Sequence, residues 1–134
     1  MGDKNSYNGA ERRKFKRKKV SFTVTYLVQQ PMEVAMRIGD KKVDAAMLDL
    51  SEEGMAIKSE HDLPVGALLA MGFVLLYAFT PYENIMQDMQ IEGEVVNRMA
   101  LSDKTFRVGI RFTKITPEDR KAISDFVAHI LQHG

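Results

Sequence analysis

Two groups of polar residues in this sequence have the types and spacing to bind an anionic ligand. The first is a basic run at residues 12–19, in which seven of the eight residues are Lys or Arg. Without these seven cations the chain holds 12 Lys and Arg against 18 Asp and Glu, so the net charge of +1 conceals a strong asymmetry. Because like charges repel, we predict an extended interaction arm at residues 11–19. Its targets would be phosphate or another dense anion, and a merely solvated arm is the alternative.

The second group is the short polar segment Asp49-x-Ser51-x-x-Gly54. A carboxylate such as Asp49 can accept two N–H bonds from the N1/N2 edge of guanine, while Ser51 adds a hydroxyl and Gly54 permits close backbone approach. Arginines of the basic run can bind guanine O6/N7 or phosphate oxygens bidentately. The two groups together favour a guanine-containing, doubly charged ligand. Taken alone, the second group is also a good strand-to-strand turn.

Other polar residues give weaker signals. Arg98 and Arg111 are on predicted late strands and are candidates to border the ligand, although most such arginines are solvated. Asp125, His129 and His133 would share one helix face, but histidines at a helix C-terminus also simply favour the helix dipole, so we expect no metal site. Because no nucleophile–base pair or Gly-rich phosphate loop is present, we expect no enzymatic activity and no cofactor.

The composition predicts one ordinary globular domain. The chain has 134 residues, of which 45% are hydrophobic and 28% are charged. It has no cysteine, which excludes disulfides and thiolate metal sites. Residues 1–19 contain no apolar stretch of a signal peptide, and the longest apolar run, at 67–79, is too short for a transmembrane helix. We therefore expect a cytoplasmic protein without a membrane span.

Hydrophobic periodicity predicts mainly strands. Residues 20–26 alternate apolar and polar side chains, and further strands are expected at 43–48, 55–57, 67–79, 91–99 and 105–115. Within 31–42 we expect two edge strands joined by a hairpin turn at 39–42. Residues 80–90 are predicted to be a loop, and residues 1–10 a disordered tail. This assigns 20–115 to a small antiparallel barrel.

A single helix is expected at 116–132. Thr116 has the character of an N-cap, Pro117 suits the first helical position, and apolar residues follow at helical spacing. The helix should pack across one opening or side of the barrel. A strand at 67–79 would be apolar on both faces, so its outer face should lie under this helix or against a second subunit. We therefore expect a homodimer.

With these two motifs in this order, the sequence resembles the PilZ domains, which are bacterial receptors for cyclic di-GMP. The resemblance covers residues 11–131 and includes both polar groups in order, as Arg13-x-x-x-Arg17 and Asp49-x-Ser51-x-x-Gly54. The lead-in at residues 11–13 and the late Gly109-x-x-Phe112 strand also match. The departure is residues 29–42, a longer excursion than a compact member needs.

The resemblance implies a six-stranded antiparallel barrel with a C-terminal helix, in one domain at 11–134. It implies a non-enzymatic receptor that holds cyclic di-GMP between the arm and the turn. Arg13 and Arg17 would hold guanine and phosphate, and Asp49 and Ser51, beside Gly54, the guanine edge. Arg13, Arg17 and Asp49 are expected at the surface.

The resemblance also bears on stoichiometry and output. Arg12, just before the first motif arginine, favours two ligands per chain. The signal would leave through an output protein, after the arm orders on the ligand, in a process such as motility, surface attachment or exopolysaccharide control. Two alternatives remain: a basic-armed barrel that binds nucleic acid, and a PilZ-like interaction module that binds no nucleotide. Phe15 is the only aromatic residue in the basic run, which argues against a nucleic-acid platform.

Overall fold

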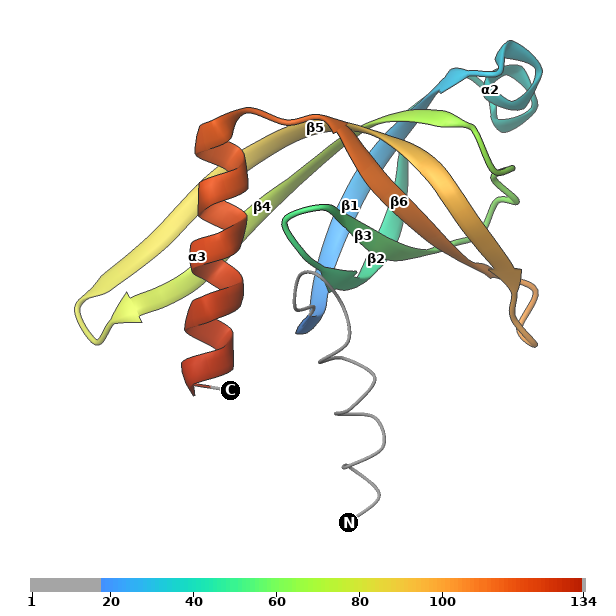
Figure 1. The fold of residues 1–134 in the computed structure, drawn as a ribbon. Coiled ribbons are helices and arrows are strands. Elements are labelled where there is room, and N and C mark those ends of the chain that lie inside the picture. Colours follow the sequence, from blue (N-terminus) through green and yellow to red (C-terminus); the bar gives the residue numbers. More distant parts are fainter. Residues whose placement is uncertain (1–17, 134) are drawn as a thin grey trace.

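The computed structural model describes the backbone of residues 18–133 and the side chains of residues 22–76, 81–83 and 86–129. Within these residues, six strands and two helices follow one another along the chain (Figure 1). Their order is β1 (Lys18–Gln30), α2 (Met32–Ile38), β2 (Val43–Leu50), β3 (Gly54–Ser59), β4 (Leu68–Thr80), β5 (Glu83–Ala100), β6 (Phe106–Lys114) and α3 (Pro117–His133).

The six strands form a closed barrel in the order β1-β2-β3-β6-β5-β4, and every neighbouring pair is antiparallel (Figure 1). This confirms the predicted six-stranded antiparallel barrel with a C-terminal helix. Alternate residues of the strands face a continuous apolar core; on β4 these are Leu69, Met71, Phe73 and Leu75. In the same core the Tyr26 hydroxyl bonds Ser59 Oγ at 2.8 Å, and burial raises the pKa of Tyr26.

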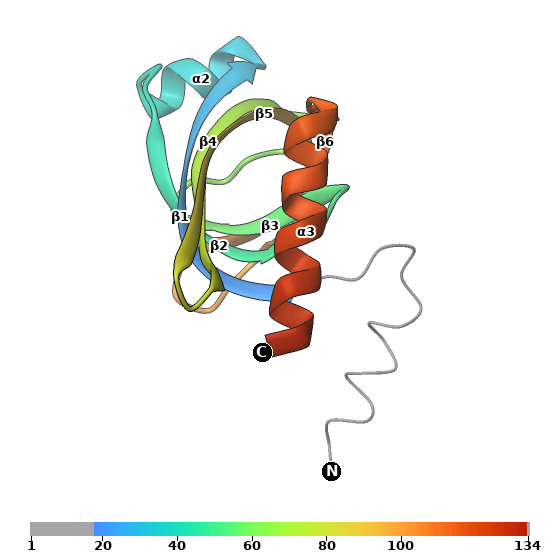
Figure 2. The same ribbon diagram turned by 90° about the vertical axis from the view of Figure 1, so that its left-hand side faces the viewer.

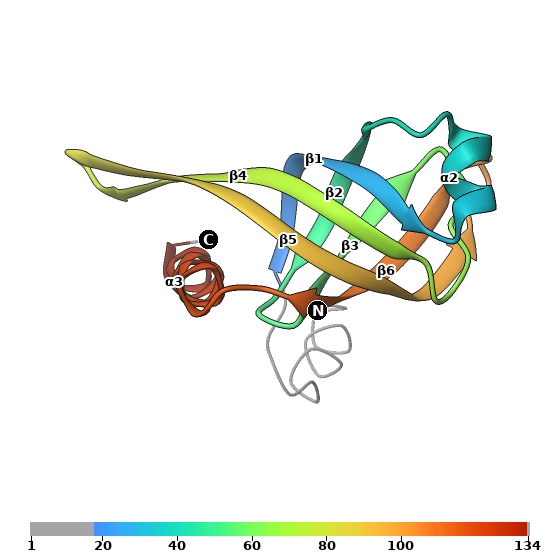
Figure 3. The same ribbon diagram turned by 90° about the horizontal axis from the view of Figure 1, so that it is seen from above.

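The predicted loop at 80–90 is wrong, because β4 and β5 continue their pairing almost to the end of a long hairpin. The register runs without interruption from Leu68↔Glu94 to Ala78↔Asn84, with an irregularity before Thr80↔Glu83. Residues 86–89 alternate between exposed and buried or half-buried positions, which is the pattern of a strand with one solvated face. Their mixed polarity therefore reflects two faces of a strand. The hairpin projects beyond the barrel, and its tip and α2 lie at opposite ends of the molecule (Figure 3).

The two edge strands predicted within 31–42 are also wrong, because this segment forms the short helix α2. Val34, Ala35 and Ile38 are buried at helical spacing, whereas Met32 and Met36 are exposed. The alternation of Met32, Val34 and Met36 that suggested a strand therefore places only Val34 in the core. The helix ends at Gly39, whose φ of 105° and backbone N–H bonds to the preceding turn form a left-handed cap.

The C-terminal helix α3 begins as predicted and runs alongside the barrel (Figure 2). The backbone N–H of Asp119 bonds Thr116 Oγ1 at 3.1 Å, which is the expected N-cap contact. The helix contacts β4 and β1, and the Phe126 ring packs at a tilt against Phe22 of β1 with ring centroids 5.5 Å apart. Gln87 of β5 donates to Asp119 Oδ1 at 3.1 Å. In the described part of the chain, no helix has both the length and the apolar character to cross a bilayer.

The helix covers only one face of the β4–β5 hairpin. Gln87, which bonds α3, is opposite the buried Leu75 in the strand register. The other face carries Val74, Leu76 and Met86, which are 45%, 56% and 74% exposed. The outer face of the apolar run at 67–79 was expected to lie under the helix or against a second subunit. The structure shows that α3 does not cover this face.

Candidate ligand-binding site

The second polar group lies where β2 turns into β3. Asp49 is near the end of β2, and the turn that follows is closed by a bond from Ser51 N to the Gly54 carbonyl oxygen at 2.9 Å. The Ser51 hydroxyl accepts from Glu53 N at 3.3 Å and donates to the Gly54 oxygen at 3.4 Å. Ser51 is 2% exposed, so its hydroxyl holds the turn together. The alternative interpretation of this segment, as a strand-to-strand turn, is therefore correct for Ser51 and Gly54.

Asp49 is buried, which corrects the expectation that this residue lies at the surface. It is 7% exposed. Its Oδ1 accepts a hydrogen bond from the backbone N–H of Ala56 at 3.1 Å, and its Oδ2 accepts one from Arg107 Nη2 at 2.9 Å. Burial of a carboxylate is tolerated when it is paired and hydrogen-bonded, as here. Asp49 therefore supports the fold as well as offering a fixed, charged acceptor.

Gly54 is required by packing against β6. A Cβ at this position would lie 3.1 Å from the Ile110 carbonyl carbon and closer still to its oxygen, and 3.2 Å from the Arg111 Cα. Those atoms belong to backbone and cannot turn aside. The sequence expectation was a close approach of the backbone to a ligand at this glycine, whereas the structure shows a close approach to β6.

A pocket of about 500 Å³ opens beside Asp49, on the outer surface of β3, β5 and β6. Small residues, Ala56 and Gly109, are among those that line it. The Asn97 amide packs against Gly109, where a Cβ would lie 2.7 Å from Asn97 Nδ2. Charged and polar side chains complete the lining, which consists of Asp49, Glu53, Ala56, Val96, Asn97, Arg107, Gly109, Ile110 and Arg111. The pocket is therefore lined by the fixed carboxylate of Asp49, by two arginines and by small residues.

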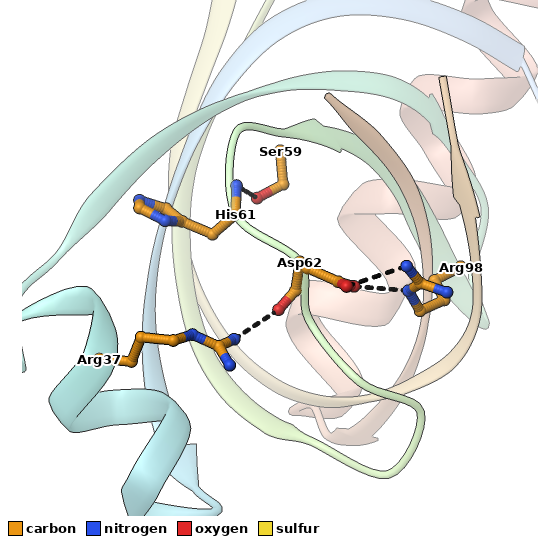
Figure 4. A network of polar contacts seen from close by, with 5 residues as sticks. All are labelled: Arg37, Ser59, His61, Asp62 and Arg98. Atoms are coloured by element: carbon orange, nitrogen blue, oxygen red, sulfur yellow. Dashed lines mark hydrogen bonds and ion pairs between the residues drawn. The ribbon is translucent and has the colours of Figure 1, made fainter. Parts of the chain in front are cut away.

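Of the two candidate bordering arginines, the structure brings only Arg111 to this pocket. Arg111 Nη2 forms an ion pair with Glu94 Oε1 at 2.7 Å, and its side chain is 59% exposed. Arg98 is elsewhere: it forms a bidentate pair with Asp62, at 2.5 and 2.9 Å (Figure 4). The Arg98 guanidinium also lies over the Phe106 ring. Arg37 of α2 donates to the Asp62 carbonyl oxygen at 2.9 Å, so Arg98 belongs to a network that ties α2 to the barrel (Figure 4).

The arm residues Arg12, Arg13 and Arg17 lie outside the described residues. The described backbone nevertheless links the two polar groups, because Lys19 of β1 is the partner of Asp49 in the β1–β2 register. Lys19 follows Arg17 by two residues in the sequence. The first motif therefore leads directly into the strand beside the second.

Sequence reasoning missed Arg107, Asn97, Glu53 and Val96 as pocket residues. A signal for Arg107 was present: Arg107, Gly109 and Arg111 follow one another at intervals of two on one strand, so they share its outer face. Asn97 had no comparable signal. The pairing of β5 with β6 shifts between Val95 and Asn97, and periodicity alone does not reveal such an irregularity.

The turn beside the pocket is also bonded to β6 and α3. Phe112 N donates to the Glu53 carbonyl oxygen at 2.8 Å, and Arg120 Nη1 of α3 donates to the Glu52 carbonyl oxygen at 3.0 Å. As for the metal hypothesis, Asp125 forms an ion pair with Lys121 at 2.9 Å, and the side chain of His133 is outside the described residues. Among the described residues no group of acidic and histidine side chains is placed to hold a metal.

The fold is a small closed barrel with a polar pocket on its outer surface, and family comparison gives its class. The PilZ domain family matches residues 11–129. The chain therefore belongs to the PilZ domain family. A comparison of the sequence with curated proteins finds no match.

Solved structures share the fold at low sequence identity. MotI/DgrA, an inhibitor of motility from Bacillus subtilis, is 14% identical with a TM-score of 0.67, over 90% of this chain and 52% of that one. The PilZ domain of YcgR from Escherichia coli, solved with c-di-GMP, is 12% identical with a TM-score of 0.57, over 91% and 93%. The MrkH–c-di-GMP complex of K. pneumonia is 14% identical with a TM-score of 0.59, over 90% and 52%. The present chain thus spans about half the length of MotI and MrkH.

Proposed function

We propose that this chain is a receptor for cyclic di-GMP, and that its role is to transmit ligand binding to a partner protein without catalysing a reaction. The observation that carries the proposal is the buried carboxylate of Asp49, held at the wall of a pocket that also contains Arg107 and Arg111. A fixed carboxylate suits the N–H donors of a guanine edge, and arginines suit its phosphates. Family membership and the ligands named for YcgR and MrkH support the same choice.

The arm would supply the remaining contacts. Arg17 precedes Lys19, the strand partner of Asp49, by two positions in the sequence, and a segment of two residues spans at most about 7 Å. Arg13 and Arg17 would contact guanine and phosphate, while Asp49 receives the other base edge. Ser51 and Gly54 would act mainly by shaping the turn, since the serine hydroxyl is bonded within it and the glycine packs on β6.

Calorimetry with cyclic di-GMP tests the proposal. Arg13→Ala, Arg17→Ala and Asp49→Asn should each weaken binding roughly ten- to a hundredfold, because a good bidentate contact is worth about 1–3 kcal/mol. Arg37→Ala is the control, since Arg37 is an exposed arginine on α2, bonded to Asp62 and outside the pocket lining. Unchanged affinity in two of the three site variants would reject the site. Binding that falls steeply with salt and is indifferent to guanine would instead favour the nucleic-acid alternative.

Stoichiometry is the second part of the proposal. Arg12 would stack on a second base and neutralise further phosphate, so two ligands should bind per chain. Titration to saturation measures this directly, and Arg12→Leu should reduce the value to one. Saturation at one ligand in both proteins would contradict the proposal.

The proposed output is an ordering of the arm when the ligand binds. Trypsin cleaves after Lys and Arg, so the basic run at 12–19 offers many cleavage sites. Cleavage within this run should slow markedly at saturating cyclic di-GMP, because the ligand would tie the arm to the barrel. Equal cleavage rates with the ligand demonstrably bound would exclude this mechanism. The ordered arm would be the surface that the partner recognises.

A further inference from the structure

Arg107 reaches across a strand to contact the carboxylate of Asp49. In the sheet, the Cα partner of Arg107 on β3 is Lys58, whereas the Cα partner of Asp49 on β3 is Ala56. The 2.9 Å bond from Arg107 Nη2 to Asp49 Oδ2 therefore connects β6 to β2 over β3. The Asp49 side chain is 10% exposed and that of Arg107 is 39% exposed, so the pair joins the protein interior to the open pocket.

Two bonds that Asp49 forms with described residues come from different directions. Ala56 N–H holds one carboxylate oxygen from the adjacent strand, and Arg107 holds the other from the strand beyond it. The terminal torsion of an aspartate is broad, so a bond to one oxygen fixes the carboxylate plane less well than bonds to both. A second bond to the other oxygen restricts rotation of this plane. Since a carboxylate offers about four acceptor sites, these two contacts are compatible with further donors.

We infer that Arg107 is a positioning residue, which orients the Asp49 carboxylate toward the guanine edge and thereby sets the preference for guanine. This inference rests on the proposed function and names a specificity determinant of that site. The guanine edge presents an N1–H and a 2-amino group, and hypoxanthine differs only by lacking the amino group. A carboxylate held in the correct plane bonds both donors of guanine, whereas a less firmly oriented carboxylate loses much of the second bond.

This role makes a prediction that a simple electrostatic role does not. If Arg107 only attracted phosphates, or moved to the ligand on binding, its removal would weaken guanine and hypoxanthine ligands equally. If it orients Asp49, its removal should act mainly on the contribution of the 2-amino group. The ratio of the two affinities therefore separates the two roles.

The experiment measures by calorimetry the affinities of cyclic di-GMP and its inosine analogue, cyclic di-IMP. The wild-type protein should prefer cyclic di-GMP at least roughly tenfold, as expected for hydrogen bonds to a charged acceptor. Arg107→Met should abolish most of this preference, and Arg107→Lys, which keeps a cationic donor, should restore part of it. In an Asp49→Asn background, Arg107→Met should change the ratio no further.

Lys58→Met is the matched control. Lys58 is the neighbour of Arg107 on β3 and also carries one positive charge, but it forms an ion pair with Asp103 at 2.8 Å and is not among the pocket-lining residues. Its removal should leave the affinity ratio unchanged. Thermal denaturation of each variant verifies folding, and Arg107→Lys supplies the comparison if Arg107→Met does not fold.

The outcomes distinguish the inference from the proposed function. If the wild type does not bind cyclic di-GMP, the proposed function fails and this inference fails with it. If the wild type binds and prefers guanine, but the Arg107 variants lose affinity equally for both ligands or keep the full ratio, only the positioning role is overturned. A reduced ratio in Arg107→Met but not in Lys58→Met supports it.

Discussion

Replacing Asp49 separates its contribution to the fold from its contribution to binding. Asp49→Ala removes both acceptors, so the buried N–H of Ala56 loses its partner and Arg107 loses its ion pair. Asp49→Asn keeps one carbonyl oxygen, which can still accept from Ala56. Its amide nitrogen would then face Arg107 and the guanine edge, where only donors are present. Alanine should therefore damage stability and binding, whereas asparagine should damage mainly binding.

The structure sets the size of these effects. Leaving a buried N–H without an acceptor costs about 1–3 kcal/mol of unfolding free energy. The ion pair contributes at most about 1 kcal/mol, because Arg107 is 39% exposed and solvent screens the interaction. Asp49→Ala should thus lose about 1–4 kcal/mol and Asp49→Asn at most about 1 kcal/mol. In a domain of this size each kcal/mol lowers the melting temperature by roughly 3–6 °C.

Urea denaturation and calorimetry test the two parts separately. Unfolding of the ligand-free proteins gives the stability difference between the two variants, and titration with cyclic di-GMP gives the affinities. Both variants should bind at least tenfold more weakly than the wild type, since neither presents a carboxylate. Equal stability of the alanine and asparagine variants would show that the bond to Ala56 is not what stabilises this region. Wild-type affinity of Asp49→Asn would refute the guanine-edge contact.

Three further predictions follow from the described side chains. Gly54→Ala should lower the free energy of unfolding in urea by roughly 1–3 kcal/mol, because its Cβ would meet the backbone of β6. Gly72→Ala should cost less, since its Cβ would meet mainly the movable Gln90 amide. Equal losses in the two variants would contradict this packing role of Gly54. Burial raises the pKa of Tyr26 in the folded state, so this residue contributes stability below its unfolded pKa of 10.0, and that stability is lost as pH rises through the higher folded value. Tyr26→Phe should therefore flatten the decline of stability above pH 10.0. An unchanged slope of stability against pH would contradict this prediction. Exposed Leu76 on the outer face of the hairpin should lie in a homodimer interface. Light scattering should therefore give a dimer for the wild type and a 15.2 kDa monomer for Leu76→Lys. A monomeric wild type would contradict the predicted dimer.

The barrel was predictable because strand periodicity is a local property. Alternating apolar residues on β1 and β2, and the N-cap at Thr116, depend on residues close together in the chain. The two errors arise where local signals are ambiguous. At residues 31–42 the same apolar residues fit periods of two and of nearly four, and only contact with β1 decides that Val34, Ala35 and Ile38 face the core. At residues 80–90 polar side chains suggested a loop, although Asp88 and Gln90 are exposed on a paired strand and Gln87 bonds α3.

For the candidate site, the sequence by itself determined the two motifs and their order, and it predicted a charged, guanine-containing ligand. Only the tertiary structure decided that Asp49 is buried, that Arg107 contacts it, that Arg111 lies in the pocket and that Arg98 binds Asp62. The physical reason is distance along the chain: Asp49 and Arg107 are 58 residues apart and meet only because β2, β3 and β6 are neighbours in the closed barrel. Local patterns identify which residues can bind, and strand order determines which of them meet.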